Sequence, residues 1–253
     1  MFKLMKYETR KNILGVIILL SVIMGFECYF LISAFAGSGV NTVVSALLLL
    51  LVAFVSYFCV FIFGITTYSK ELKSKSGYMT FMTPISSFTV IGSKLLVTLL
   101  EGIFFAILLV ALACINMGII EAQFPMVKIF TDFVEMFASL IEINVGQIVL
   151  GFFATVLDLV INYIAIVSMA YLAITLSSTI FQNRKFKGIV STIIFIIFLI
   201  IVRKIGGLLP NGEDANDMTG VFVAMIPTLL FYIAVAVGSI FASGTLLDKK
   251  VSL

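Results

Sequence analysis

Long apolar stretches separated by short polar segments dominate the pattern along the chain. Six of them reach the roughly 20 residues that a helix needs to cross a bilayer. They lie at about 13–36, 41–67, 95–120, 146–180, 188–209 and 220–246. Because lipid offers backbone groups no hydrogen-bond partner, each stretch is predicted to be an α-helix. The alternating pattern of a membrane β-barrel is missing. The predicted fold class is therefore all-α, a polytopic membrane protein with one transmembrane domain over residues 1–253.

Composition supports this class and excludes several chemistries. Charged residues make up 11% of the chain, against roughly 25% in soluble domains. The chain has no histidine, which excludes a Ser-His-Asp triad and a histidine zinc site. Its three cysteines all lie in apolar stretches and are read as small apolar residues. The net charge of +3 is small and scattered, which argues against a nucleic-acid partner.

The first apolar stretch could be mistaken for a signal peptide, because Ala34-Phe35-Ala36 resembles a cleavage site. The stretch 13–36 is longer than a signal peptide's apolar region and contains Glu27, so we expect a retained first span. Residues 2–12 are predicted to form an amphipathic helix on the inner leaflet; a plain basic tail is the alternative.

The distribution of basic residues predicts the orientation. Of the 16 Lys and Arg residues, all but Lys128, Arg203 and Lys204 fall on one side of the predicted spans. By the positive-inside rule that side is cytoplasmic, and both termini lie on it. The connection Tyr68–Lys94 is then an inside loop, in which Ser86 or Ser87 could cap the helix of the third span.

The connection between spans three and four is predicted to hold an amphipathic helix on the outer surface. Pro125 suits its start. Its polar stripe recurs at helical spacing over Lys128, Asp132, Glu135, Ser139 and Glu142. The fourth span, 146–180, is too long for one untilted helix and too short for two, so it either tilts or begins in the outer interface.

Three carboxylates fall inside apolar stretches: Glu27, Glu101 and Asp158. Acids within a membrane are candidates for function, although partial hydration or protonation near an interface is an alternative for Glu27 and Glu101. The three differ in predicted depth and have no histidine between them, so a proton relay has little support. The chain also lacks a P-loop, because Ser87 stands where the first glycine of that motif would precede Gly92-Ser93-Lys94.

The second-to-third-span loop contains Tyr68-Ser69-Lys70-Glu71, Lys75-Ser76-Gly77-Tyr78-Met79-Thr80, Thr83-Pro84-Ile85-Ser86 and Ile91-Gly92-Ser93-Lys94-Leu95-Leu96. Together with the basic start and the six spans, it resembles the permease subunits of type-2 ABC exporters. The nearest likeness is to small bacterial permeases for bacteriocin, lantibiotic and peptide-toxin export or immunity.

This resemblance implies a transporter subunit of a bacterial plasma membrane, without an ATPase site of its own. Two copies of an ATP-binding cassette subunit would hold ATP and magnesium, a second permease would complete a homodimer or heterodimer, and the cargo would be an amphipathic peptide. The loop would contact the ATPase through Tyr68, Glu71, Lys73, Gly77, Tyr78 and Pro84. Residues 182–187 would form a second contact, and residues 2–12 a connecting helix. The chain departs from the family's larger members by carrying its outer helix between spans three and four.

Two other classes stay open. A proton-coupled secondary carrier would use Glu27, Glu101 or Asp158, and a repeated pair of broken helices would favour it. A membrane protein that binds a peptide for immunity without transporting it is the third class. A neighbouring reading frame for an ATP-binding subunit would favour the exporter over both.

Overall fold

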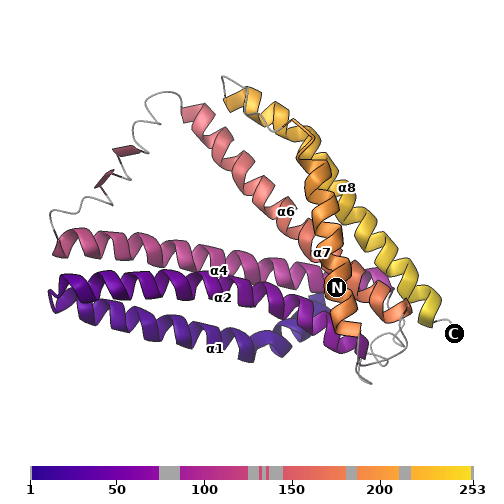
Figure 1. Cartoon of the computed structure of the whole chain (residues 1–253), viewed down its shortest axis with the longest axis horizontal. Helices are drawn as coiled ribbons and strands as arrows, with labels where there is room; N and C mark the ends of the chain where they lie inside the picture. Colours follow the sequence, from indigo (N-terminus) through magenta and orange to yellow (C-terminus); the bar gives the residue numbers. More distant parts are fainter. Residues whose placement is uncertain are drawn as a thin grey trace. The chain divides into compact units, whose positions relative to one another are not determined.

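The computed structural model describes residues 2–73, 86–124, 131–132, 135–136, 145–180, 187–210 and 218–251. Within these residues it is helical and contains no strand, and six of its helices are long and apolar enough to cross a membrane (Figure 1). They are α1 (Phe2–Phe35), α2 (Gly39–Lys73), α4 (Ser87–Gln123), α6 (Val145–Ile180), α7 (Lys187–Gly206) and α8 (Met218–Val251). This confirms the predicted all-α class with six spans, and the chain is a multi-pass membrane protein.

Several helices extend well beyond the predicted spans. The segment 2–12 is helical, but it is continuous with the first span inside α1 and does not form a separate short helix. The ends of the predicted inside loop are also helical, because α2 runs to Lys73 and α4 begins at Ser87. Lysine, glutamate and leucine are strong helix formers, so the polar residues after the second apolar stretch continue the helix. The described ends of the Tyr68–Lys94 connection are thus helical, which leaves residues 74–85 between α2 and the cap of α4.

Specific residues account for two of the helix ends. Gly37 adopts a positive φ of 69°, and its amide donates to the Ala34 carbonyl at 3.2 Å, which closes the end of α1. At the start of α4, the Thr89 amide donates to Ser86 Oγ at 3.4 Å. Ser86 is thus the N-cap, as the sequence predicts.

The fourth apolar stretch is a single helix of 36 residues, α6. At 1.5 Å per residue it is roughly 54 Å long, and therefore longer than a bilayer core of ~30 Å. It either tilts or extends beyond the core, in line with the expectation for this stretch. The predicted outer helix between spans three and four falls mostly outside the described residues; the four of its residues that the structure describes, 131–132 and 135–136, are helical.

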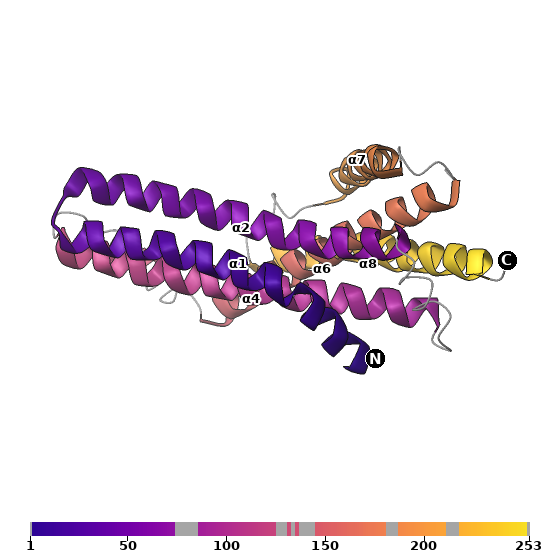
Figure 2. The same ribbon diagram turned by 90° about the horizontal axis from the view of Figure 1, so that it is seen from below.

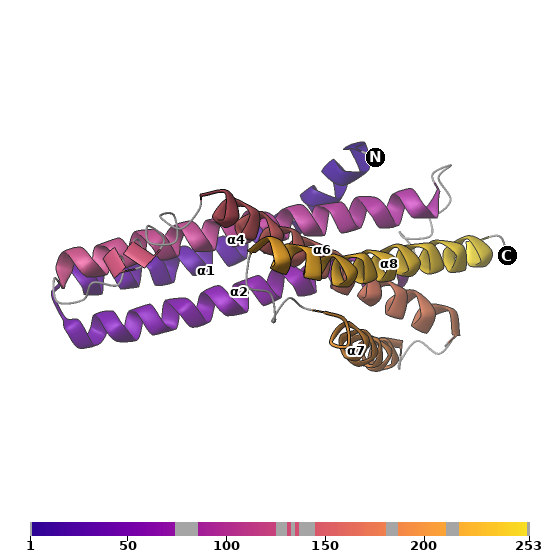
Figure 3. The same cartoon turned by 90° about the horizontal axis from the view of Figure 1, so that it is seen from above.

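The chain divides into two compact units. Unit 1 comprises residues 1–6, 64–99 and 145–253, and unit 2 comprises residues 7–63 and 100–144. In unit 1, α6 packs against α7 and α8, and α6 and α8 run side by side (Figures 1 and 3). The buried face of α6 carries mainly small residues, which allow close helix approach in a membrane. They include Ala165, Ser168, Ala170, Ala173 and Ser177.

In unit 2, the helices α1, α2 and α4 run alongside one another (Figures 1 and 2). One buried side chain from each helix forms the centre of the core: Ile23, Val60 and Phe105. Partly buried residues pack around them, namely Val16, Leu19, Leu20, Val52, Leu108, Leu109 and Leu112. Many other large apolar side chains of these helices are exposed, as expected for helices whose surrounding solvent is lipid.

Candidate functional site

A buried polar network in unit 1 joins α2, α4 and α6. The rings of Tyr68 on α2 and Tyr171 on α6 are stacked, with centroids 4.3 Å apart, and each side chain is 1% exposed. The Tyr68 hydroxyl shares a hydrogen bond of 2.7 Å with Thr175 Oγ1, and the Thr175 hydroxyl also lies 2.8 Å from the Tyr171 carbonyl. The stacking and the hydrogen bonds fix one face of α2 against one face of α6.

Thr98 brings α4 into the same network. Its Oγ1 lies 3.2 Å from the Tyr171 hydroxyl and donates to the Lys94 carbonyl at 2.8 Å. The Tyr163 hydroxyl donates to the Thr98 carbonyl at 3.2 Å. We call Tyr68, Thr98, Tyr163, Tyr171 and Thr175 the tyrosine–threonine cluster. It forms a continuous set of contacts from α2 through α6 to α4.

An ion pair lies between the end of α2 and the beginning of α4. Lys94 Nζ and Glu71 Oε2 are 2.5 Å apart, and the two side chains are 3% and 6% exposed. A buried ion pair is geometrically demanding, because each charge needs the other to offset the loss of water. The two residues lie on either side of the 74–85 connection. Their pairing holds the two ends of that connection together.

The first turn of α4 is also joined to the last turns of α8. Ser87 Oγ donates to Asp248 Oδ1 at 2.5 Å, and the rings of Phe88 and Phe241 have centroids 5.9 Å apart. A Cβ at Gly244 would collide with the Phe88 ring, so only glycine allows this approach. The helices on both sides of the 74–85 connection therefore make specific contacts within unit 1.

The residues predicted to contact an ATPase have different places in the structure. Tyr68 and Glu71 are buried side chains of α2, occupied by the cluster and the ion pair. Lys73 is the last residue of α2, and its side chain lies outside the described part. Gly77, Tyr78 and Pro84 lie outside the described residues. Residues 182–186 of the predicted second contact do so as well.

Sequence reasoning missed the partners of these residues. Lys94 was noted as part of the loop but not as a partner of Glu71, and Tyr171, Thr175 and Thr98 were not singled out. A weak signal was present, since Tyr171 and Thr175 are four residues apart on a helix and so share a face. Their pairing with Tyr68, which lies more than a hundred positions earlier, has no signature in a single sequence.

The three carboxylates within the spans each bond to an asparagine. Asn116 Nδ2 donates to Glu27 Oε2 at 3.2 Å, and Asn12 Nδ2 lies 3.2 Å from both carboxylate oxygens of Glu101. These two pairs link α1 to α4 in unit 2. Asp158 accepts from Asn162 Nδ2 at 2.9 Å, one turn along α6 in unit 1.

Within unit 2 the structure does not bring Glu27 and Glu101 together. Glu27 bonds to Asn116 of α4. Glu101 lies on the same helix as Asn116, roughly 22 Å before it at a rise of about 1.5 Å per residue. Asp158 belongs to the other unit. Among the described residues, no group of three or more potential metal ligands occurs either. The acids therefore form separate carboxyl–amide pairs, with no shared metal or proton-relay site between them in unit 2.

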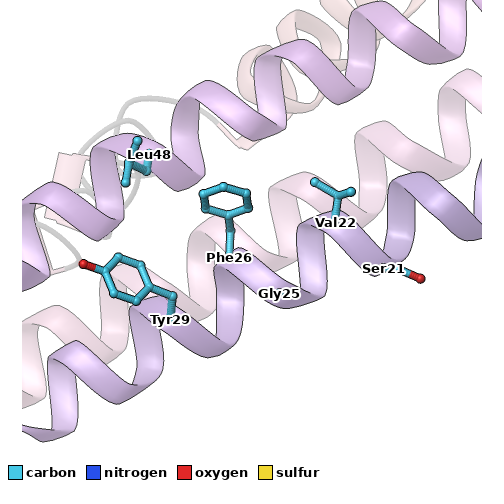
Figure 4. Close-up of a pocket in the computed structure, with 6 residues that line it drawn as sticks. All are labelled: Ser21, Val22, Gly25, Phe26, Tyr29 and Leu48. Carbon is cyan, nitrogen blue, oxygen red and sulfur yellow. The ribbon is translucent and has the colours of Figure 1, made fainter.

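A pocket of about 390 Å³ lies between α1 and α2 in unit 2 (Figure 4). Its lining is mostly apolar and consists of Ser21, Val22, Gly25, Phe26, Tyr29 and Leu48. Ser21 Oγ already donates to the Ile17 carbonyl at 2.8 Å. The pocket thus offers apolar contact and no constellation for catalysis.

No protein-family model, curated protein or solved structure matches this chain.

Proposed function

We propose that the chain is the membrane-spanning permease subunit of an ATP-driven exporter that moves amphipathic peptides out across a bacterial plasma membrane. A separate ATP-binding cassette subunit in two copies binds ATP and magnesium, and a second permease subunit completes the pathway. The observation that supports this proposal most is the buried ion pair between Glu71 and Lys94, because it joins the two ends of the connection assigned to the ATPase contact.

The contacts in unit 1 suit a mechanical role. A carrier without an energy source of its own needs a partner or a gradient. In an exporter driven by a partner, the force acts on helices that move as rigid bodies. The Glu71–Lys94 pair makes α2 and α4 respond together to a displacement of the 74–85 connection. The tyrosine–threonine cluster then transmits the displacement to α6. Tyr68 and Glu71 act in this scheme as positioning residues: they hold the helices next to the 74–85 connection, which itself contacts the ATPase.

The spans suit an amphipathic cargo. The chain has 25 Phe residues and few charged ones. Flexible or broadly apolar surfaces accept varied sequences because they do not demand fixed hydrogen-bond partners. We therefore expect short amphipathic helical peptides to stimulate ATP hydrolysis by the permease reconstituted with the ATP-binding subunit of a neighbouring reading frame. Scrambled peptides of the same composition should stimulate it less, and equal stimulation by both would contradict the peptide cargo.

The ion pair gives a direct test of coupling. Glu71→Lys and Lys94→Glu each place two like charges together, so each should reduce peptide-stimulated hydrolysis. The double variant restores opposite charges and should recover much of it. Lys70→Ala changes an exposed residue next to Glu71 and serves as the matched control. Pro84→Ala probes the connection itself. Full stimulation in every variant that reaches the membrane would show that this region does not transmit force.

The proposal also requires the 74–85 connection to be cytoplasmic. Single cysteines at positions 76 and 185, in a background without Cys28, Cys59 and Cys114, should react with an impermeant reagent only from inside. Cysteines at positions 132 and 214 should react only from outside. Outside labelling at position 76 would overturn the orientation and with it the ATPase contact.

A further inference from the structure

The pair formed by Glu27 and Asn116 contains a buried acceptor with no donor. Glu27 is 6% exposed and Asn116 is 7% exposed, and both lie inside membrane-spanning helices of unit 2. Asn116 Nδ2 donates to Glu27 Oε2 at 3.2 Å. Asn116 Oδ1, on the same amide, has no hydrogen-bond partner among the described residues. The Glu27 carboxylate and the Asn116 amide oxygen, which are both hydrogen-bond acceptors, are thus buried next to each other.

Among the described residues of unit 2, no basic side chain lies beside Glu27. The described basic residues of the unit are Arg10 and Lys11 at the start of α1. Lys11 lies roughly 24 Å from Glu27 along α1 at the usual helical rise. The parts of α2 and α4 in this unit carry no Lys or Arg. Lys128, in the connection that follows α4, lies outside the described residues.

In the described part of the chain, none of the other titratable groups on the three helices of unit 2 forms a hydrogen bond or an ion pair with Glu27. They are Tyr7, Glu8, Cys28, Tyr29, Tyr57, Cys59, Glu101, Cys114 and Glu121. Of these, Glu101 is bonded to Asn12, and Glu121 is bonded to Thr131. Among the described residues, the hydrogen-bond partner of the Glu27 carboxylate is the neutral amide of Asn116.

An ionised carboxylate in this setting has no charged partner, which is unfavourable within a membrane. The unpartnered Asn116 oxygen adds a second cost, because a buried acceptor without a donor loses its bonds to water. One added donor between the two groups removes both costs. A divalent cation is a poor candidate, since it needs six or more oxygen ligands. The buried hydroxyls of Ser33, Thr42 and Ser45 on α1 and α2 already bond to backbone carbonyls.

We propose that Glu27 and Asn116 form a proton-binding site. The neutral Glu27 carboxyl group donates its O–H to Asn116 Oδ1, while Asn116 Nδ2 donates to Oε2, so that acid and amide close a ring of two hydrogen bonds. The proton comes from a hydronium ion of the surrounding water, which is left as a neutral water molecule, and no other covalent bond changes. Release of the proton leaves the carboxylate facing the amide oxygen and weakens the link between α1 and α4. This inference goes beyond the proposed function and does not depend on it.

Infrared spectroscopy of the full chain in lipid nanodiscs tests the proposal. A neutral carboxyl group gives a carbonyl stretching band above the amide region, and an ionised one does not. We expect such a band at neutral pH and expect Glu27→Gln to abolish it. Asp158→Asn and Lys128→Ala serve as controls and should leave this band in place. A spectrum that Glu27→Gln does not change, or an ionised Glu27, would overturn the proposal.

Asn116→Leu supplies a second measurement. It retains the size of the side chain but removes the amide, so the Glu27 carbonyl band should move to higher frequency as its hydrogen bond is lost. Glu27→Gln should leave the thermal midpoint unchanged, because a glutamine amide can donate to Asn116 Oδ1 as the neutral acid does. Asn116→Leu should lower that midpoint. An unshifted band in Asn116→Leu would overturn the proposed ring even if Glu27→Gln failed to fold.

Discussion

In unit 1 the helices α2, α4 and α6 meet through buried hydroxyls, stacked tyrosine rings and an ion pair. In unit 2 the helices α1, α2 and α4 meet through aliphatic and aromatic side chains around Phe105, with two carboxyl–amide pairs added. Apolar contacts between helices compete with equally apolar lipid, whereas hydrogen bonds and ion pairs have directions. The contacts in unit 1 therefore specify one arrangement of helices more strictly than those in unit 2.

This difference bears on how the two units respond to change. A network of directional bonds loses several interactions when one member is removed, because the remaining partners stay buried without it. A core of apolar side chains loses contacts in proportion to the volume removed. Substitutions matched between the units should show these two kinds of response.

The largest effect is expected from Lys94→Met in unit 1. It leaves the Glu71 carboxylate buried beside an uncharged side chain, and breaking a buried pair in this way costs roughly 3–5 kcal/mol. Equilibrium unfolding in mixed micelles measures the loss. Adding Glu71→Leu to this variant removes the remaining charge and should recover most of the stability. A Lys94→Met variant as stable as the parent would contradict a strong pair.

Phe105→Ala is the matching substitution in unit 2. Phe105 is fully buried at the centre of the apolar cluster, and removing a buried phenylalanine ring costs roughly 3 kcal/mol or more. Phe104→Ala, on the exposed neighbouring residue, should cost much less. A smaller apolar residue such as leucine should restore part of the loss at position 105.

A pair of glycines sharpens the comparison further. A Cβ at Gly64 in unit 1 would overlap the side chain of Thr98, whose hydroxyl is bonded to the Lys94 carbonyl. Gly64→Ala should therefore cost about 1–3 kcal/mol through overpacking. Gly25→Ala in unit 2 meets nothing within 4 Å and should stabilise α1 by up to about 1 kcal/mol. Unfolding of both variants under the same conditions checks the opposite signs.

The smallest effect is expected from Tyr68→Phe. It keeps the ring stacked on Tyr171 and removes only the hydrogen bond to Thr175, at a cost of about 1 kcal/mol. Tyr57→Phe changes an exposed tyrosine of the same helix and should have no measurable effect. An equal loss in both variants would show that the Tyr68 hydroxyl contributes nothing specific.

Much of the fold follows from local properties of the sequence. The length and composition of each apolar stretch predict a spanning helix, and Ser86 was correctly predicted as a possible cap of α4. The boundaries were less accurate, because polar helix-forming residues extend α2 and α4 past their apolar parts. The start of α1 shows the same effect, since nothing between residues 2 and 12 interrupts the helix.

The candidate site was predictable only in part. Tyr68 and Glu71 were identified through a family resemblance as members of a loop that would contact an ATPase, and in the structure both are buried. Glu27, Glu101 and Asp158 were found because an acid within an apolar stretch is conspicuous. Their asparagine partners were not identified, because an uncharged asparagine is less costly to bury and its presence in an apolar stretch does not by itself indicate a site.

The sequence by itself determined that this chain crosses a membrane six times as helices, because transfer into lipid depends on the local run of apolar residues and on backbone bonds within each segment. Only the tertiary structure decided that Tyr68 meets Tyr171, Glu71 meets Lys94 and Glu27 meets Asn116. The first and third pairs join helices that are far apart in the sequence, and the second joins two helices separated by the 74–85 connection. Which faces meet depends on side-chain packing and directional bonds between helices, and the periodicity of one helix does not encode its partner.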